Sequence, residues 1–167
     1  MGTSIVFMGV SGCGKSSLAA AVAADTGLAL VEGDDFHSPS SREKMRAGVP
    51  LTDADRAAWL AALGEQLQAH PEGVLLTCSS LKRAYRDQLR AASPGLRFVF
   101  LDIDRAEAQR RVASRTSHFF SATLVDNQFA TLESPVGEDG VLRVDARAPV
   151  DALQRQVSAW LAQEDLP

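Results

Sequence analysis

The sequence predicts an α/β fold, a three-layer α/β/α sandwich built around a five-stranded parallel sheet. Short β-like apolar runs alternate with longer helical segments along the 167 residues. These runs do not alternate apolar with polar residues, which suits strands that crossover helices cover on both faces. A glycine-rich turn joins the first apolar run to the first helical segment. This strand–loop–helix order fits the alternation of strands and helices in an α/β fold.

Each element follows from its apolar pattern and its flanking residues. The expected strands are Ile5–Met8, Leu28–Val31, Val74–Cys78, Phe98–Leu101 and Val141–Val144. The expected helices are Lys15–Thr26, about Ser41–Ala47, Asp53–Ala69, Lys82–Ala92, Arg105–Ser114, a segment within Ala122–Leu132, and Val150–Gln163. We expect Asp53 to be the N-cap of its helix, because the preceding Pro50-Leu51-Thr52 disfavours an earlier start. No repeat or linker interrupts the chain, so one domain should span residues 1–167, with Pro135–Gly140 as a polar connection inside it.

Composition limits the classes of partner. The formal net charge of -4 argues against broad binding to nucleic acid or to anionic membranes, since proteins that bind either partner usually have a concentrated positive surface. The two cysteines, Cys13 and Cys78, lie far apart and form no metal-type cluster, which fits a reducing compartment. No apolar stretch is long enough to span a membrane, and we see no leader. We therefore expect a cytoplasmic protein whose basic residues bind small anions.

Residues 9–16 form the strongest motif, Gly-Val-Ser-Gly-Cys-Gly-Lys-Ser, between the first strand and the first helix. Glycines let the backbone curl so that several N–H groups face one anion, and the helix N-terminus adds its positive end. In such a phosphate-binding loop Lys15 reaches the outer phosphates and the Ser16 hydroxyl binds Mg²⁺. An ordinary glycine-rich turn requires neither group at a fixed position. We assign nucleotide binding to Gly9, Val10, Ser11, Gly12, Cys13, Gly14, Lys15, Ser16 and Ser17.

A second signal follows the second strand, where Glu32, Asp34 and Asp35 stand close together. Residues two apart on an extended chain point the same way, so Glu32 and Asp34 should face one side. The carboxyl ends of parallel strands line the ligand crevice. Asp34 is our candidate for orienting an attacking hydroxyl and accepting its proton, and Glu32 for holding a Mg²⁺-bound water. A polar loop start is the alternative, which we expect for Asp35.

The remaining motifs carry a family resemblance. They are Gly33-Asp34, His37, Lys44-Met45, Gly48, Pro50-Leu51, Asp53, Asp55-Arg56, Trp59-Leu60, Cys78 to Lys82, Tyr85 to Asp87, Arg111, Arg115, His118 to Phe120, Gln128-Phe129 and Thr131 to Glu133. With the phosphate loop, they make nearly the whole chain resemble the gluconokinases. Cys13, Glu32, Ser38 and Ser117 depart from the residues usual in that family.

The resemblance implies a P-loop kinase fold like those of adenylate and shikimate kinases, with a mobile lid at about residues 115–135. It implies ATP and Mg²⁺ as cofactors, phosphorylation of D-gluconate at its terminal hydroxyl to 6-phosphogluconate, and commonly a homodimer. It also implies that Arg115 contacts the transferring phosphates from the lid, while Arg111 lies against the adenine with Pro149 on the other side. A solvated basic helix face is the alternative for the two arginines, which are four residues apart.

Substrate binding is expected of Ser79, Lys82 and Arg86, because the crevice rule and the resemblance both place this end of the chain near the acceptor. A cation there would recognise a sugar-acid carboxylate; the alternative for Lys82 and Arg86 is helix solubility. We expect Lys44 to bind the substrate for a similar reason. His37 either bonds substrate hydroxyls or fastens its loop. His118, with Phe119 and Phe120, would help to close a dry site from the lid, and packing in the core is the alternative for this segment.

The leading hypothesis is a gluconokinase in which Asp34 orients the acceptor while Lys15, Mg²⁺ on Ser16 and Arg115 neutralise the moving phosphoryl group. A kinase for another small hydroxy acid, such as shikimate, is the nearest alternative. A nucleotide-binding regulatory module is the alternative from another class, but it has no need of a carboxylate aimed at a nucleophile.

Overall fold

The computed structural model describes residues 2–114 and 122–164. Its strands are β1 (Ile5–Met8), β2 (Ala29–Glu32), β3 (Val74–Thr77), β4 (Arg97–Asp102) and β5 (Val141–Asp145). Its helices are α1 (Lys15–Thr26), α2 (Pro39–Arg46), α3 (Asp53–Gln68), α4 (Arg83–Ala92), α5 (Arg105–Ala113), α6 (Ala122–Thr131) and α7 (Val150–Glu164), with a 3₁₀ turn η1 (Gly33–Phe36).

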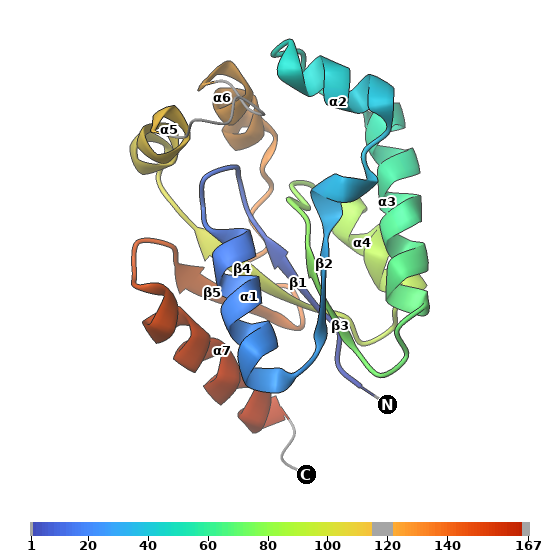
Figure 1. Cartoon of the computed structure of the whole chain (residues 1–167), viewed down its shortest axis with the longest axis vertical. Coiled ribbons are helices and arrows are strands. Elements are labelled where there is room, and N and C mark those ends of the chain that lie inside the picture. Colours follow the sequence, from blue (N-terminus) through green and yellow to red (C-terminus); the bar gives the residue numbers. More distant parts are fainter. Residues whose placement is uncertain (1, 115–121, 165–167) are drawn as a thin grey trace.

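The five strands form one parallel sheet in the order β2-β3-β1-β4-β5. Strand β1 lies at its centre, with Val6 opposite Leu76 on one side and opposite Phe98 on the other. Helices α1 and α7 cover one face and α3 and α4 the other (Figure 1). The predicted α/β/α sandwich is confirmed, and the predicted elements are present with ends that differ by a few residues.

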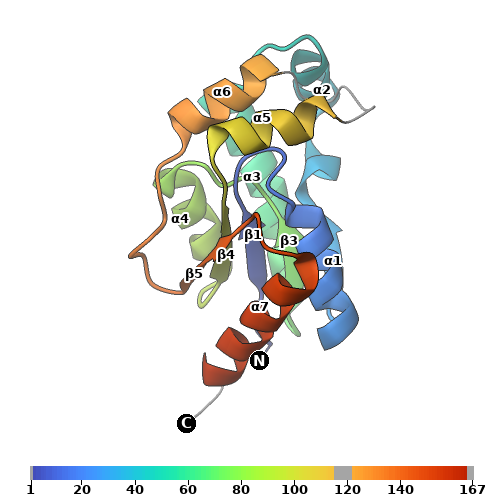
Figure 2. The same ribbon diagram turned by 90° about the vertical axis from the view of Figure 1, so that its left-hand side faces the viewer.

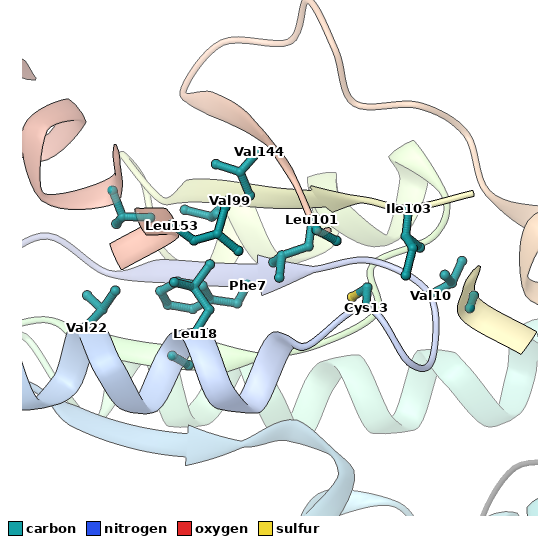
Figure 3. Packing of buried hydrophobic residues seen from close by; sticks show 14 of the residues in the cluster. Phe7, Val10, Cys13, Leu18, Val22, Val99, Leu101, Ile103, Val144 and Leu153 are labelled. Atoms are coloured by element: carbon teal, nitrogen blue, oxygen red, sulfur yellow. The ribbon is translucent and has the colours of Figure 1, made fainter. Parts of the chain in front are cut away.

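Alternate residues of β1 enter two hydrophobic clusters, one on each face of the sheet, because successive side chains on a strand point to opposite faces. Ile5 and Phe7 pack beneath α1 and α7, in the cluster that also contains Cys13 (Figure 3). Val6 and Met8 pack beneath α3 and α4. All four β1 side chains are fully buried, which fixes the start of the glycine-rich loop at the centre of the molecule.

Two expectations about the elements were wrong. The strands at the sheet edges, β2 and β5, are not covered on both faces; most of their residues are half-buried or exposed, because the flanking helices centre on β1, β3 and β4. Asp53 is not the N-cap of α3. Thr52 is, in a capping box in which its side chain accepts from the N–H of Asp55 and the Asp55 carboxylate accepts from the N–H of Thr52.

Helices α2, α5 and α6 lie beyond the carboxyl ends of the strands, around the glycine-rich loop (Figures 1 and 2). Their placement creates an open end of the sheet where loops from several strands meet. Within the described residues, no helix has the length and apolarity needed to cross a membrane.

Candidate active site

A cavity of about 360 Å³ opens at the carboxyl ends of the strands. Its walls come from the glycine-rich loop, η1, the α2–α3 connection, the segment before α4, and α6. The lining residues are Ser11, Gly12, Gly14, Lys15, Ser16, Ser17, Asp34, His37, Met45, Val49, Pro50, Leu51, Asp53, Arg56, Ser79, Lys82, Tyr85, Leu124, Asn127, Gln128 and Thr131. Predicted nucleotide-binding and acceptor-binding residues therefore meet in one cavity.

The glycine-rich loop has the curled backbone that a phosphate cradle needs. Gly12 and Gly14 have φ values of 88° and 97°, a left-handed conformation that other residues rarely adopt. Lys15 begins α1, and its Nζ donates to the carbonyl oxygens of Gly9 at 2.9 Å and Val10 at 3.2 Å. The ammonium thus lies against the loop at the cavity, next to the backbone N–H groups that would surround an anion.

The back of this loop is anchored in the core. Val10 and Cys13 are only 2% and 1% exposed, and both belong to the cluster under α1 and α7 (Figure 3). The Cys13 side chain therefore faces away from the cavity, and its contribution to nucleotide binding would come from its backbone. A β-carbon on Gly9 would lie 2.8 Å from Cys13 Sγ, so glycine is required where the loop leaves β1.

Arg111 of α5 supports the loop from outside the cavity. One of its terminal nitrogens donates to Gly12 O at 3.2 Å and the other to Ala146 O at 3.0 Å. Glu107, one helical turn earlier, accepts from its Nε at 3.0 Å. Arg111 therefore joins the glycine-rich loop to the segment that follows β5. Arg111 therefore does not lie on a solvated helix face, which was the alternative to a role at the site.

Ser16 and Glu32 lie together at the edge of the cavity. The Ser16 hydroxyl donates to Glu32 Oε2 at 2.9 Å, and the Thr77 hydroxyl donates to the same oxygen at 2.7 Å. Within residues 2–114 and 122–164, no three His, Cys, Asp or Glu side chains gather as a metal cluster. A hydroxyl with a carboxylate behind it nevertheless fits Mg²⁺, which takes few protein ligands and completes its shell with water and substrate phosphates.

Asp34 faces the same cavity as Lys15, although the local geometry differs from the prediction. The chain after Glu32 turns into the 3₁₀ segment η1 and is not extended, so the two-residue alternation does not apply. His37 closes η1, with its Nε2 3.4 Å from Asp34 Oδ1. Partial desolvation of the carboxyl group opposes ionisation, but this contact and the positive charges of Lys15 and Arg42 outweigh it and keep the pKa of Asp34 below its ordinary value.

Trp59 of α3 determines where η1 lies. Its indole Nε1 donates to Gly33 O at 2.7 Å, and its ring stacks on His37 with 4.1 Å between centroids. A β-carbon on Gly33 would fall 2.0 Å from Thr77 O, so only glycine allows η1 to approach β3 this closely. Trp59 is buried in the core and also fixes the segment that carries Asp34.

A second part of the cavity wall contains Asp53, Arg56, Lys82 and Tyr85, and Ser79 also lines the cavity. Asp53 Oδ1 accepts from the Tyr85 hydroxyl at 2.5 Å and from Lys82 Nζ at 3.2 Å. These hydrogen bonds hold the pKa of Asp53 below its ordinary value. Sequence reasoning missed Arg56 and Tyr85 as site residues and gave Asp53 only a capping role. The i, i+3 spacing of Asp53 and Arg56 in the first turn of a helix is common on helix surfaces, so the sequence contains no specific signal for either role.

Helix α6, which lies within the expected lid, also lines the cavity, although none of its side chains was predicted as a site residue. The side chains that line the cavity, Leu124, Asn127, Gln128 and Thr131, recur at the spacing of one helix face. Gln128 is 7% exposed, and its Oε1 accepts from the backbone N–H of Ser11 at 2.5 Å. The helix at the end of the expected lid therefore contacts the glycine-rich loop directly.

Arg86 does not reach the cavity, which corrects its expected role in substrate binding. Its side chain is fully buried and donates to Glu138 through Nε at 3.1 Å and through a terminal nitrogen at 2.6 Å. The other terminal nitrogen donates to Ser80 O at 2.8 Å. Ser80 has a left-handed φ of 51°, unusual for a residue other than glycine. Arg86 thus supports the segment next to Ser79 from behind.

Two further predicted residues lie outside the cavity lining. Lys44 Nζ is bonded to Asp55 Oδ2 at 2.6 Å and joins α2 to α3. Pro149 is exposed and accepts the first hydrogen bond of α7 from the N–H of Leu153. Arg115 and His118 fall outside the described residues.

Comparisons with known proteins agree with this site. A family model described as an AAA domain matches residues 5–135. A gluconokinase from Gluconobacter oxydans (strain 621H) is 42% identical over 165 residues, covering 96% of this chain and 92% of that protein. A crystal structure of a gluconokinase from Sinorhizobium meliloti 1021 matches with a TM-score of 0.89 at 46% identity, covering 96% and 92% of the two chains. The structure of a sugar kinase from Janibacter sp. HTCC2649 matches with a TM-score of 0.92 at 39% identity, covering 97% and 95%. The chain therefore belongs to the gluconokinase family of ATP-dependent P-loop kinases.

Proposed function

We propose that this protein transfers the γ-phosphoryl group of ATP to the terminal hydroxyl of D-gluconate, giving 6-phospho-D-gluconate. The observation that carries the proposal is that one cavity brings together Asp34, Lys15 of the glycine-rich loop, and a wall with the cations Arg56 and Lys82. A kinase of a sugar acid needs these three elements: a carboxylate for the hydroxyl, a cradle for the phosphates and cations for the acid group. The names of the 42% and 46% identical relatives support gluconate as the acid.

Asp34 is the group that receives the acceptor. Asp34 is ionised at neutral pH, so its oxygens accept a hydrogen bond from the terminal hydroxyl and can take up its proton as the phosphoryl group moves. His37 and Trp59 hold η1 so that the carboxylate stays directed to the cavity. Positioning of this kind accounts for much of the catalysis of phosphoryl transfer.

The backbone N–H groups of the glycine-rich loop and Lys15 would bind the β- and γ-phosphates and neutralise their charge. Ser16, backed by Glu32, would hold Mg²⁺, which supplies further neutralisation of the phosphate oxygens when bound. Arg111 would support the loop beside the nucleotide through its bonds to Gly12 O and Ala146 O. Pro149, near the end of the same segment, remains our candidate for the other side of the adenine.

We also propose roles for the expected lid, part of which lies outside the described residues. Residues 1–167 would form a single kinase domain with a lid at about 115–135 that closes on the substrates. Arg115 would contact the transferring phosphates, and His118 would exclude water from the closed site.

We also propose a cytoplasmic homodimer that binds neither nucleic acid nor membranes. Its product would enter the pentose phosphate pathway.

A coupled assay of ADP release tests the function. D-gluconate, shikimate, D-glycerate, D-glucose and no acceptor are compared at saturating ATP, with Mg²⁺ and with excess chelator. We expect acceptor-dependent ADP release that is highest with gluconate and requires Mg²⁺. Preference for shikimate or glycerate would select another hydroxy-acid kinase, and nucleotide binding without acceptor-dependent release would select a regulatory module.

A further inference from the structure

Three side chains with a permanent positive charge line the described part of the cavity: Lys15, Arg56 and Lys82. Lys15 is held on carbonyl oxygens of the glycine-rich loop, at the phosphate end. Lys82 is bonded to Asp53. Arg56 has no hydrogen-bonded or ion-paired carboxylate among the described residues, and its half-buried guanidinium lies 5.7 Å from the centre of the Tyr85 ring.

The Tyr85 ring organises this wall. Lys82 Nζ lies 5.6 Å from its centre, so Arg56 and Lys82 both contact one aromatic ring. The Tyr85 hydroxyl donates to Asp53, which fixes the one carboxylate that balances them. Arg56 and Lys82 together with Asp53 leave a net positive charge at the cavity wall. The guanidinium of Arg56 carries this charge, and its N–H donors can bind a ligand.

Helix α3 links Arg56 to the residues around Asp34. It precedes Trp59 by three residues on α3, so it lies on the same helix face about 4.5 Å further toward the N-terminus. Trp59 stacks on His37, and His37 contacts Asp34. An acceptor whose hydroxyl bonds to Asp34 can therefore extend along this face of α3 and bring its other end to Arg56.

We propose that Arg56 binds the carboxylate of the sugar-acid acceptor, with Lys82 as its second cation, and thereby makes the enzyme select acids over uncharged polyols. A guanidinium presents paired donors that match the two oxygens of a carboxylate, and Tyr85 holds it in place. The inference rests on the proposed function, because it assigns the acid-recognition subsite of that cavity. Arg56 acts in binding and is remote from the transferred group.

The test combines an altered residue with an altered substrate. R56M and R56K are compared with the wild type on D-gluconate and on D-gluconamide, in which an uncharged amide of similar size replaces the carboxylate. R56M should lower kcat/KM for gluconate by ~10²-fold, the cost of removing one partner of a partly buried charge pair, and change kcat/KM for gluconamide by less than about threefold. R56K should fall between R56M and the wild type, and KM for ATP should stay unchanged.

R83M is the matched control, because Arg83 lies on α4 next to Lys82 but is 66% exposed and outside the cavity lining. It should match the wild type on both acceptors. Binding of gluconate measured by calorimetry provides a second readout, independent of turnover.

Equal losses on gluconate and gluconamide, or gluconate kinetics unchanged in R56M, would overturn the assignment of Arg56. If the wild type instead phosphorylates a different acid, the gluconate proposal fails, and the same comparison of that acid with its amide still decides the role of Arg56.

Discussion

Gln128 of α6 accepts a hydrogen bond from the backbone N–H of Ser11, so a helix within the expected lid is bonded to the tip of the glycine-rich loop. Both residues are buried. Any movement of α6 must either carry the loop along or break this bond. The position of the phosphate cradle is thus coupled to the segment that covers it.

Replacing Gln128 by Leu keeps the volume but removes the acceptor, leaving the Ser11 N–H buried without its partner. We expect KM for ATP to rise by ~5- to 150-fold, because an unsatisfied buried donor costs about 1–3 kcal/mol and the loop shifts to relieve it. The measurement is KM for ATP at saturating gluconate, and a normal value in Q128L would show that the bond does not position the loop.

Replacing Asp34 by Asn keeps the size of the side chain and removes its charge and its capacity to take a proton. Turnover should fall by ~10²- to 10⁴-fold, the usual contribution of a positioned acid or base. ATP binding, measured by calorimetry, should change little, and D35N serves as the neighbouring control because Asp35 is exposed and outside the cavity. Near-normal turnover in D34N would remove Asp34 from the mechanism.

Replacing Arg86 by Met should destabilise the fold by about 3–5 kcal/mol, since Glu138, whose side chain is 7% exposed, loses the two hydrogen bonds from Arg86. Burial of Glu138 favours its neutral form, but Arg86 and Arg90 keep its pKa below the ordinary value. The R86M/E138L double variant should recover part of the stability. Urea unfolding followed by circular dichroism measures both; a substrate-binding role would instead raise KM for gluconate at unchanged stability.

Acid should weaken the join between α2 and α3. The hydrogen bond from Lys44, followed by backbone and side-chain bonds to Thr52, lowers the pKa of Asp55 from 3.8 to about 2. A carboxylate with a depressed pKa stabilises the fold fully above about pH 4, and this contribution is lost as pH falls from about 4 to 2. D55N should therefore be less stable than the wild type at pH 6, and the difference should shrink by pH 2. A difference that is constant with pH would contradict the assignment.

Most of the fold could be predicted because it depends on local pattern. The strand–loop–helix from Ile5 to Thr26 occupies the predicted range, since apolar periodicity and glycine positions determine it locally. The η1 turn could not be predicted. It depends on the approach of Gly33 to Thr77 and on the indole of Trp59, contacts between residues 26 and 44 positions apart.

The same distinction holds for the site. Lys15, Ser16 and Asp34 belong to short motifs with a stated chemistry, and the structure brings them to one cavity. Arg86 was misassigned, because its sequence position places it near the acceptor but only the fold brings Glu138 to its guanidinium. Arg56 and Gln128 were missed, because each acquires its position from elements that meet only in the folded protein.

The two thiols offer a way to follow partial opening of the molecule. Cys13 lies in the cluster under α1 and α7, and Cys78 lies in the cluster under α3 and α4, where burial raises its pKa to about 11. Neither forms a disulfide, and each is at most 2% exposed. A thiol-reactive dye would thus label each cysteine only when its own layer separates from the sheet. Comparing the two labelling rates with and without nucleotide would reveal which side of the sandwich a bound phosphate tightens.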